Sequence, residues 1–221
     1  MAKETGNRLQ ATGILLAGGK SSRMRRNKAF LELDGEPLVA RSLHVLQEIF
    51  AEVLISSNDP HLYETYGAKV VPDLVQGRGP VGGLQAGLKA ASFDYVFFVA
   101  CDMPFLEPKL IRFLSRWAGE YDVVVPQIDG KLNPLHAFYG RTCLPYVEKY
   151  LEAGRLKIID FYPECKVRYV GPEEMALAFG LPAREKEAAE RLEQAFLNVN
   201  TPEQWDRLIQ AQAALPNRLV Y

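Results

Sequence analysis

Residues 12–28 read TGILLAGGKSSRMRRNK, and this stretch indicates both the fold and the kind of ligand. It begins with a short apolar run, which predicts a buried strand over residues 12–17. Two glycines follow, and then five cationic side chains with no acid among them: Lys20, Arg23, Arg25, Arg26 and Lys28. A strand that ends in a glycine turn and a dense positive loop is suited to bind several closely spaced negative charges. A nucleoside triphosphate is the simplest ligand of that kind.

Strands and helices alternate through the first half of the chain. Apolar runs predict strands over residues 12–17, 53–55, 69–71 and 95–100, the last of them continuous as in a strand covered on both faces. Apolar spacing and prolines near first turns predict helices over residues 37–50, 60–66 and 80–91. The alternation predicts an α/β fold, a three-layer domain with a mostly parallel, doubly wound, Rossmann-like sheet.

The second half of the chain is less regular. Residues 122–125 and 136–139 are predicted to be strands on either side of a turn at Asp129-Gly130. Helices are predicted over residues 143–153 and 202–213, and an exposed helix over residues 182–194. No linker is visible, so we expect one domain over residues 1–221, of which residues 1–11 are flexible.

Composition narrows the class of protein. The chain has 221 residues, is 48% hydrophobic and carries a net charge of −1, which argues against a nucleic-acid-binding protein despite the basic loop. Its three cysteines show no CxxC spacing, so neither a disulfide framework nor a zinc site is predicted. No signal peptide and no apolar stretch of about 20 residues is visible, so no membrane is involved and a cytoplasmic location is expected.

The basic loop matches neither of the common phosphate-binding motifs. A Walker A motif would need glycine where the chain has Ile14, and GxGxxG does not fit residues 17–23. The expectation therefore comes from residue chemistry: Gly18 and Gly19 let backbone N–H groups approach phosphates, and Arg23 and Lys28 supply charged contacts. The alternative is a solvated basic loop.

Two further loops are predicted at the same edge of the sheet, beyond the carboxyl ends of the third and fourth strands. The first contains Asp73 and then four glycines within residues 77–83, Gly82 among them, which permit close approach of a flat ligand such as a nucleobase. Ordinary turn chemistry is the alternative. The second contains Asp102, whose carboxylate suits Mg²⁺ shared with substrate phosphates. Its alternative is a turn or helix-capping role.

The other candidate residues are weaker. Cys101 is interpreted as a small packed residue rather than a nucleophile. The three histidines show no catalytic or metal-ligand spacing, and His44 and His61 are interpreted as structural. In the segment NVNTP, residues 198–202, Thr201 is predicted to cap a helix with Gln204 at its third position. The two asparagines of that segment either form a turn or face a metal or phosphate.

Taken together, these motifs resemble one family. LAGGxSxRMxxxK, the Pro-Asp after the third strand, GPVGGL, CDMP and NVNTP occur in the order seen in the molybdenum cofactor guanylyltransferases, within the sugar-nucleotidyltransferase-like enzymes. The resemblance implies transfer of GMP from GTP to the terminal phosphate of molybdenum-bound molybdopterin, with release of pyrophosphate. It also implies a nucleotide-binding half, residues 12–105, and an acceptor-binding half, residues 106–221, that includes the C-terminal helix.

The resemblance and the residue chemistry together give a set of expected roles. Mg²⁺ is the expected cofactor, held by Asp102 with Asn198 and Asn200 as further candidates. Partners would be GTP, molybdenum-molybdopterin and proteins that deliver molybdopterin or mature molybdoenzymes. Catalysis is assigned to Arg23, Lys28 and Asp102, and nucleotide binding to Leu16, Ala17, Gly18, Gly19, Lys28, Asp73, Gly82 and Asp102.

The sequence departs from the family pattern at two places. Arg25 stands where most relatives have glycine, and the asparagine that some relatives place after the second strand aligns with Ser56, with Asn58 two residues later. Two alternatives stay open. The first is a different nucleotidyltransferase, either a CTP-using molybdopterin cytidylyltransferase or an enzyme that acts on another small acceptor. The second is a nucleotide-binding module without catalysis. The LAGG turn favours GTP, because the CTP-using relatives tend to carry an AAG-type turn.

Overall fold

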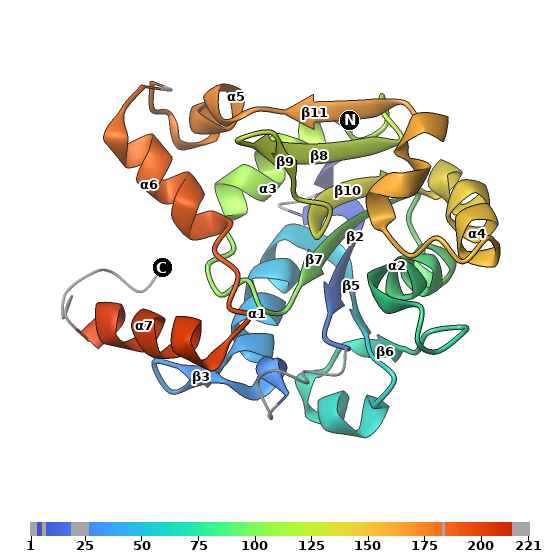
Figure 1. Ribbon diagram of the computed structural model, residues 1–221, viewed down its shortest axis with the longest axis horizontal. Helices are drawn as coiled ribbons and strands as arrows, with labels where there is room; N and C mark the ends of the chain where they lie inside the picture. The colour runs from blue at the N-terminus through green and yellow to red at the C-terminus, as the bar shows by residue number, and fades with distance from the viewer. Residues whose placement is uncertain (1–3, 6–7, 19–26, 183, 214–221) are drawn as a thin grey trace.

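A mostly parallel sheet forms the centre of the protein (Figure 1). The computed structural model describes residues 4–5, 8–18, 27–182 and 184–213, and within these residues nine strands join the sheet. Seven follow one path in the order β11-β8-β10-β7-β2-β5-β6, and of these only β10 runs antiparallel to its neighbours. The path strands are β2 (Arg8–Leu16), β5 (Phe50–Ser56), β6 (Lys69–Val71), β7 (Tyr95–Ala100), β8 (Val123–Ile128), β10 (His136–Gly140) and β11 (Val167–Val170). The predicted fold class is confirmed.

The two central strands, β2 and β7, are covered on both faces. Side chains alternate between two buried clusters, so that Ile14 and Phe98 pack on one face and Leu15 and Phe97 on the other. This explains why the apolar run of β7 is continuous in the sequence. β2 begins at Arg8, so residues 8–11, which we expected to be flexible, belong to the sheet.

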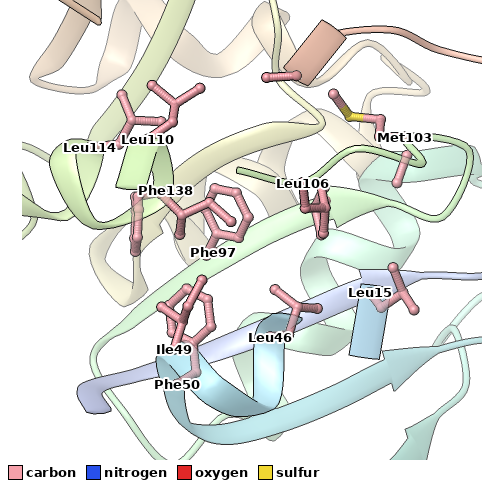
Figure 2. Close-up of a cluster of buried hydrophobic side chains, with 14 of the residues drawn as sticks. Leu15, Leu46, Ile49, Phe50, Phe97, Met103, Leu106, Leu110, Leu114 and Phe138 are labelled. Carbon is pink, nitrogen blue, oxygen red and sulfur yellow. The ribbon is translucent and has the colours of Figure 1, made fainter. Parts of the chain in front are cut away.

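Helices form a layer on each side of the sheet. Figure 1 shows α1 (Leu38–Ile49), α3 (Pro108–Leu114) and α6 (Lys186–Ala195) on one face, and α2 (Gly79–Ala90) and α4 (Leu144–Glu152) on the other. Leu46 and Ile49 of α1 and Leu110 of α3 pack with Phe50 and Phe97 of the sheet (Figure 2). The three-layer arrangement is therefore as predicted, and none of the described helices is long and apolar enough to span a bilayer.

The second half differs from the prediction in its details. Asp129 and Gly130 both have positive φ, 49° and 73°, as a two-residue hairpin turn requires. The strand that pairs with β8 across this turn is β9 (Lys131–Leu132), whereas the predicted strand after the turn is β10, which instead runs between β7 and β8. The sequence did not predict β11, the short helix α5 (Pro172–Ala176) or the 3₁₀ helix η5 (Ile158–Glu164).

One buried histidine has consequences for stability. His136, the first residue of β10, is 0% exposed, and its ring lies 5.0 Å from Phe97 and 4.8 Å from Phe196. Neither ring nitrogen has a hydrogen-bond partner among the described residues. Burial lowers the pKa of His136 to about 3, which keeps the imidazole neutral in the folded protein.

We expect His136 to make the protein less stable in acid. In the unfolded chain a histidine has a pKa of about 6.5, so the unfolded state binds a proton that the folded state does not between that pH and about 3. The free energy of unfolding should fall by about 2 kcal/mol at pH 5 from this group alone. Urea unfolding should show that the free energy of unfolding decreases by this amount between pH 8 and pH 5 in the wild type. The same decrease should be missing in His136→Phe. An equal pH dependence in both proteins would contradict the assignment.

Candidate functional site

The register of the sheet brings the predicted loops together. Leu16 lies opposite both Ser56 and Ala100, and Ser56 lies opposite Val71, so four parallel strands end at one level. The chain leaves β2 toward β5 and β6 on one side, and β7 lies on the other side. Ligands of open α/β sheets bind at such a switch point, outside the carboxyl ends of the strands.

A charged cluster is built at this edge from three distant parts of the chain. The Lys28 ammonium lies 3.1 Å from the Asp102 carboxylate and donates a hydrogen bond of 2.8 Å to the Asn200 side-chain carbonyl. The Lys28 and Asp102 side chains are only 16% and 18% exposed. Lys28 begins the 3₁₀ helix η1 (Lys28–Phe30), and Asp102 follows β7. Three residues singled out from the sequence therefore meet at one point.

The segment that carries Asn200 is held by its own hydrogen bonds. The Gln204 side-chain oxygen accepts from the backbone N–H groups of Asn200, at 2.7 Å, and of Thr201, at 3.2 Å, while the Gln204 N–H donates to the Thr201 hydroxyl. This is the predicted cap of α7 (Pro202–Ala213). In addition, the Val199 N–H donates to the Asp102 carbonyl at 2.9 Å. The Asn198 amide has a different partner, the Phe196 carbonyl.

A second polar pair lies beyond β5 and β6. The Asn58 amide donates to the Asp73 carboxylate, and the Asp73 backbone N–H donates to the Asn58 side-chain oxygen, each at 2.9 Å. Ser56 is 1% exposed, so of the two residues considered from the sequence, Asn58 is the one at the surface of the site. A Cβ atom on Gly82 would lie 2.9 Å from the Arg78 side chain and 3.6 Å from the Asp73 carboxyl carbon. Glycine therefore lets the first turn of α2 pass close to Asp73.

The backbone at the end of β2 is largely committed to internal contacts. The Ala17 N–H donates to the Ser56 carbonyl at 3.0 Å, and the Leu16 carbonyl accepts from the Cys101 N–H at 3.0 Å. Ala17 is buried, whereas Gly18 is exposed. The predicted site residues Gly19 and Arg23, and the departure at Arg25, lie outside the described residues. Among Leu16, Ala17 and Gly18, the expected contacts of this turn that the structure describes, Gly18 is thus the most open to a ligand.

The chemistry of the site favours hard cations and phosphate over nucleophilic catalysis. Burial, reinforced by the adjacent Asp102 carboxylate, raises the pKa of the Cys101 thiol to about 12, so it stays protonated as the sequence interpretation requires. The described residues contain no group of three or more His, Cys, Asp or Glu side chains able to hold a metal. The Asp102 and Asn200 oxygens already converge on a cation, the Lys28 ammonium, and both are oxygen ligands of the kind that Mg²⁺ prefers.

One residue of the site escaped the sequence interpretation. Tyr63, in the 3₁₀ helix η2 (Pro60–Tyr66), is 0% exposed and donates a hydrogen bond to the Ala17 carbonyl at 2.8 Å. A tyrosine inside a short helical segment carries no motif that would mark it. Its role is visible only once the sheet brings β2 and η2 together.

Comparison with known proteins identifies the family of this chain. Residues 13–165 match the model of the MobA-like NTP transferase domain. A probable molybdenum cofactor guanylyltransferase of Pelotomaculum thermopropionicum is 43% identical over 194 residues, which cover 88% of this chain and 89% of the relative. The molybdenum cofactor guanylyltransferase of Desulfosudis oleivorans is 34% identical over 206 residues, covering 92% and 95% of the two chains.

Solved structures show the same architecture. The crystal structure of molybdopterin-guanine dinucleotide biosynthesis protein A from Archaeoglobus fulgidus superposes with a TM-score of 0.77 at 23% sequence identity, over 92% of this chain and 99% of that one. The family model covers most of the chain, and the relatives exceed 30% identity over nearly its whole length. This protein belongs to the MobA-like NTP transferase family, and it is a nucleotidyltransferase.

Proposed function

We propose that this protein transfers GMP from GTP to the terminal phosphate of molybdenum-bound molybdopterin and releases pyrophosphate. Two relatives of nearly the same length are named for guanylyl transfer to the molybdenum cofactor. The observation that carries the proposal is the convergence of Lys28, Asp102 and Asn200 at the carboxyl edge of the sheet. An acceptor phosphate oxygen forms a bond to the α-phosphorus of GTP, and the bond from that phosphorus to the β-phosphate bridging oxygen breaks.

The residues of the site suit this reaction because its main obstacle is electrostatic. The acceptor phosphate is already a nucleophile, so no side-chain base or covalent nucleophile is required. An anion must nevertheless approach a polyanion, and the Lys28 ammonium would offset that repulsion and stabilise charge on the departing pyrophosphate. Arg23 is assigned the same role. Gly18 and Gly19 would admit phosphate oxygens close to the backbone.

We further propose Mg²⁺ as the cofactor. Asp102 would hold it, with Asn200 as the next candidate and Asn198 a weaker one, because the Asn198 amide is bound to a backbone carbonyl. This small number of protein ligands is sufficient for Mg²⁺, because the ion completes its coordination with water and substrate phosphates. When bound, Mg²⁺ would neutralise charge at the α-phosphate and orient it for in-line attack.

The base of the nucleotide is assigned to the second polar pair. Asn58 and Asp73 lie beside the glycine-rich start of α2, where Gly82 keeps the helix close to Asp73. Their amide and carboxylate groups offer both a donor and an acceptor, as recognition of a guanine edge requires. Leu16, Ala17 and Gly18 would contribute the wall on the other side of the base.

The nucleotide preference can be tested by competition. Purified protein is supplied with equal GTP, CTP, ATP and UTP, Mg²⁺ and molybdenum-molybdopterin, and the product is identified by mass. We expect the guanine dinucleotide and stoichiometric pyrophosphate. A cytosine dinucleotide would refute guanylyl transfer and indicate cytidylyl transfer. Nucleotide binding without pyrophosphate release would indicate a binding module instead.

A further inference from the structure

One buried hydroxyl group joins the two boundaries of the basic loop. The Tyr63 hydroxyl donates to the carbonyl of Ala17, just before the loop, and accepts a hydrogen bond of 3.3 Å from the side-chain amide of Asn27, just after it. Its ring stacks on Phe30 with a centroid separation of 5.5 Å and an angle of 24°. The same side chain therefore contacts the residue before and the residue after positions 18–26.

Asn27 extends this contact to the charged cluster. While its amide nitrogen donates to Tyr63, its side-chain oxygen accepts from the Ala29 N–H and caps η1. Lys28 is the first residue of η1 and reaches Asp102 at 3.1 Å. An unbroken chain of hydrogen bonds and one turn of helix thus leads from Tyr63 through Asn27 to the Lys28 backbone.

The chemistry of the Tyr63 hydroxyl suits this double contact. Burial raises the pKa of Tyr63, so the hydroxyl keeps its proton at neutral pH and donates while its oxygen accepts. Ala17 is buried, so in Tyr63→Phe the Ala17 carbonyl would lose the hydroxyl that donates to it. A buried polar group that loses its partner is costly, and the backbone would shift to satisfy it.

We propose that Tyr63 is a positioning residue for the triphosphate: it sets the spacing between the glycine turn at Gly18 and the Lys28 ammonium. This rests on the proposed function in one respect only, that these two groups bind phosphates of the same nucleotide. Tyr63 itself touches no substrate. Its loss displaces the phosphate-binding groups but removes none of them, so it raises KM for GTP more than it lowers kcat.

The chain offers a matched control for removing a buried hydroxyl. Tyr139 is also fully buried, and its hydroxyl donates to the Pro134 carbonyl at 2.7 Å and lies 2.9 Å from the Tyr162 hydroxyl. It belongs to the cluster on the opposite face of the sheet. Tyr139→Phe therefore loses the same number of buried hydrogen bonds without touching the basic loop.

The experiment compares GTP affinity by calorimetry, and thermal stability, in wild type, Tyr63→Phe and Tyr139→Phe. We expect both variants to melt at lower temperature and only Tyr63→Phe to bind GTP more weakly, by about tenfold, the effect of one or two hydrogen bonds. GTP affinity in Tyr63→Phe equal to that of the wild type, or an equal loss in Tyr139→Phe, would overturn the proposal. Failure of the wild type to bind any nucleoside triphosphate would instead refute the proposed function.

A second variant keeps the proposal testable if Tyr63→Phe does not fold. Asn27→Ser retains an oxygen that can cap η1, but it is too short to reach Tyr63. We expect it to weaken GTP binding by a similar factor, and the double variant to be no weaker than either single one, because both remove the same contact. Losses that multiply in the double variant would show that the two residues act separately.

Discussion

Asp102→Ala is expected to lower turnover by about a thousandfold or more while the protein remains folded. Asp102 supplies the carboxylate of the charged cluster. Its removal leaves the Lys28 ammonium with Asn200 but without its anionic partner, and leaves the proposed Mg²⁺ without its main ligand. The structural hydrogen bond at this position survives, because the Val199 N–H is bound to the backbone carbonyl of Asp102. Steady-state pyrophosphate release measures the loss, and circular dichroism measures the fold.

An acid beside the opposite end of β7 provides the control. Asp94 directly precedes β7, and its side chain is 90% exposed. Asp94→Ala should therefore turn over GTP at the wild-type rate. Asp102→Asn separates charge from shape, and we expect it to be nearly as inactive as the alanine variant. Normal GMP transfer by purified Asp102→Ala would remove both the metal-binding and the catalytic role from this residue.

Lys28→Ala is expected to reduce kcat/KM for GTP by about a hundredfold or more. Its ammonium is only partly exposed and is held by two oxygens at a fixed place, so charge developing on the phosphates meets a preorganised cation. Lys28→Arg should recover part of the activity, because the charge is kept while the geometry changes. Stopped assays of pyrophosphate release over a range of GTP concentrations separate the effects on kcat and KM.

The control for Lys28 is a charged lysine that lies outside the candidate functional site. Lys186, in α6, is 90% exposed and forms a surface ion pair with Glu190. Surface pairs of this kind contribute little, so Lys186→Ala should leave kcat/KM unchanged. A loss of less than tenfold in Lys28→Ala would contradict the role assigned to this ammonium and would assign the phosphate contacts to the other cations of the basic loop.

Much of the fold could be predicted from local patterns. β7 has the bounds that its apolar run predicts, because a strand covered on both faces leaves a continuous signal. The short edge strand β6 also has its predicted bounds, residues 69–71. α2 was expected over residues 80–91, next to its observed bounds, because proline near the first turn marks the start. By contrast, β11 is a four-residue edge strand whose pairing with β8 depends on tertiary contacts, and η5 contains Pro163 and has no helical periodicity.

The residues of the candidate site could be predicted from the sequence, but the contacts between them could not. Motif chemistry identified Lys28, Asp102 and Asn200, which are separated by as many as 172 positions along the chain. No spacing rule says that they meet, and their contact follows from the strand register and the return of the chain before α7. The sequence did not decide whether Ser56 or Asn58 contacts the nucleotide, because the two residues are distinguished only by their burial.

The bonds from Val199 to Asp102 and from Asn200 to Lys28 have a consequence for synthesis of the protein. The first 105 residues already contain Gly18, Lys28 and Asp102, yet the charged cluster lacks Asn200 until position 200 has left the ribosome. A nascent chain is therefore unable to assemble the complete cluster until the segment around Asn200 has been made and has emerged. The cluster is completed in one late step, when the returning segment pairs with the residue that follows a strand made a hundred residues earlier.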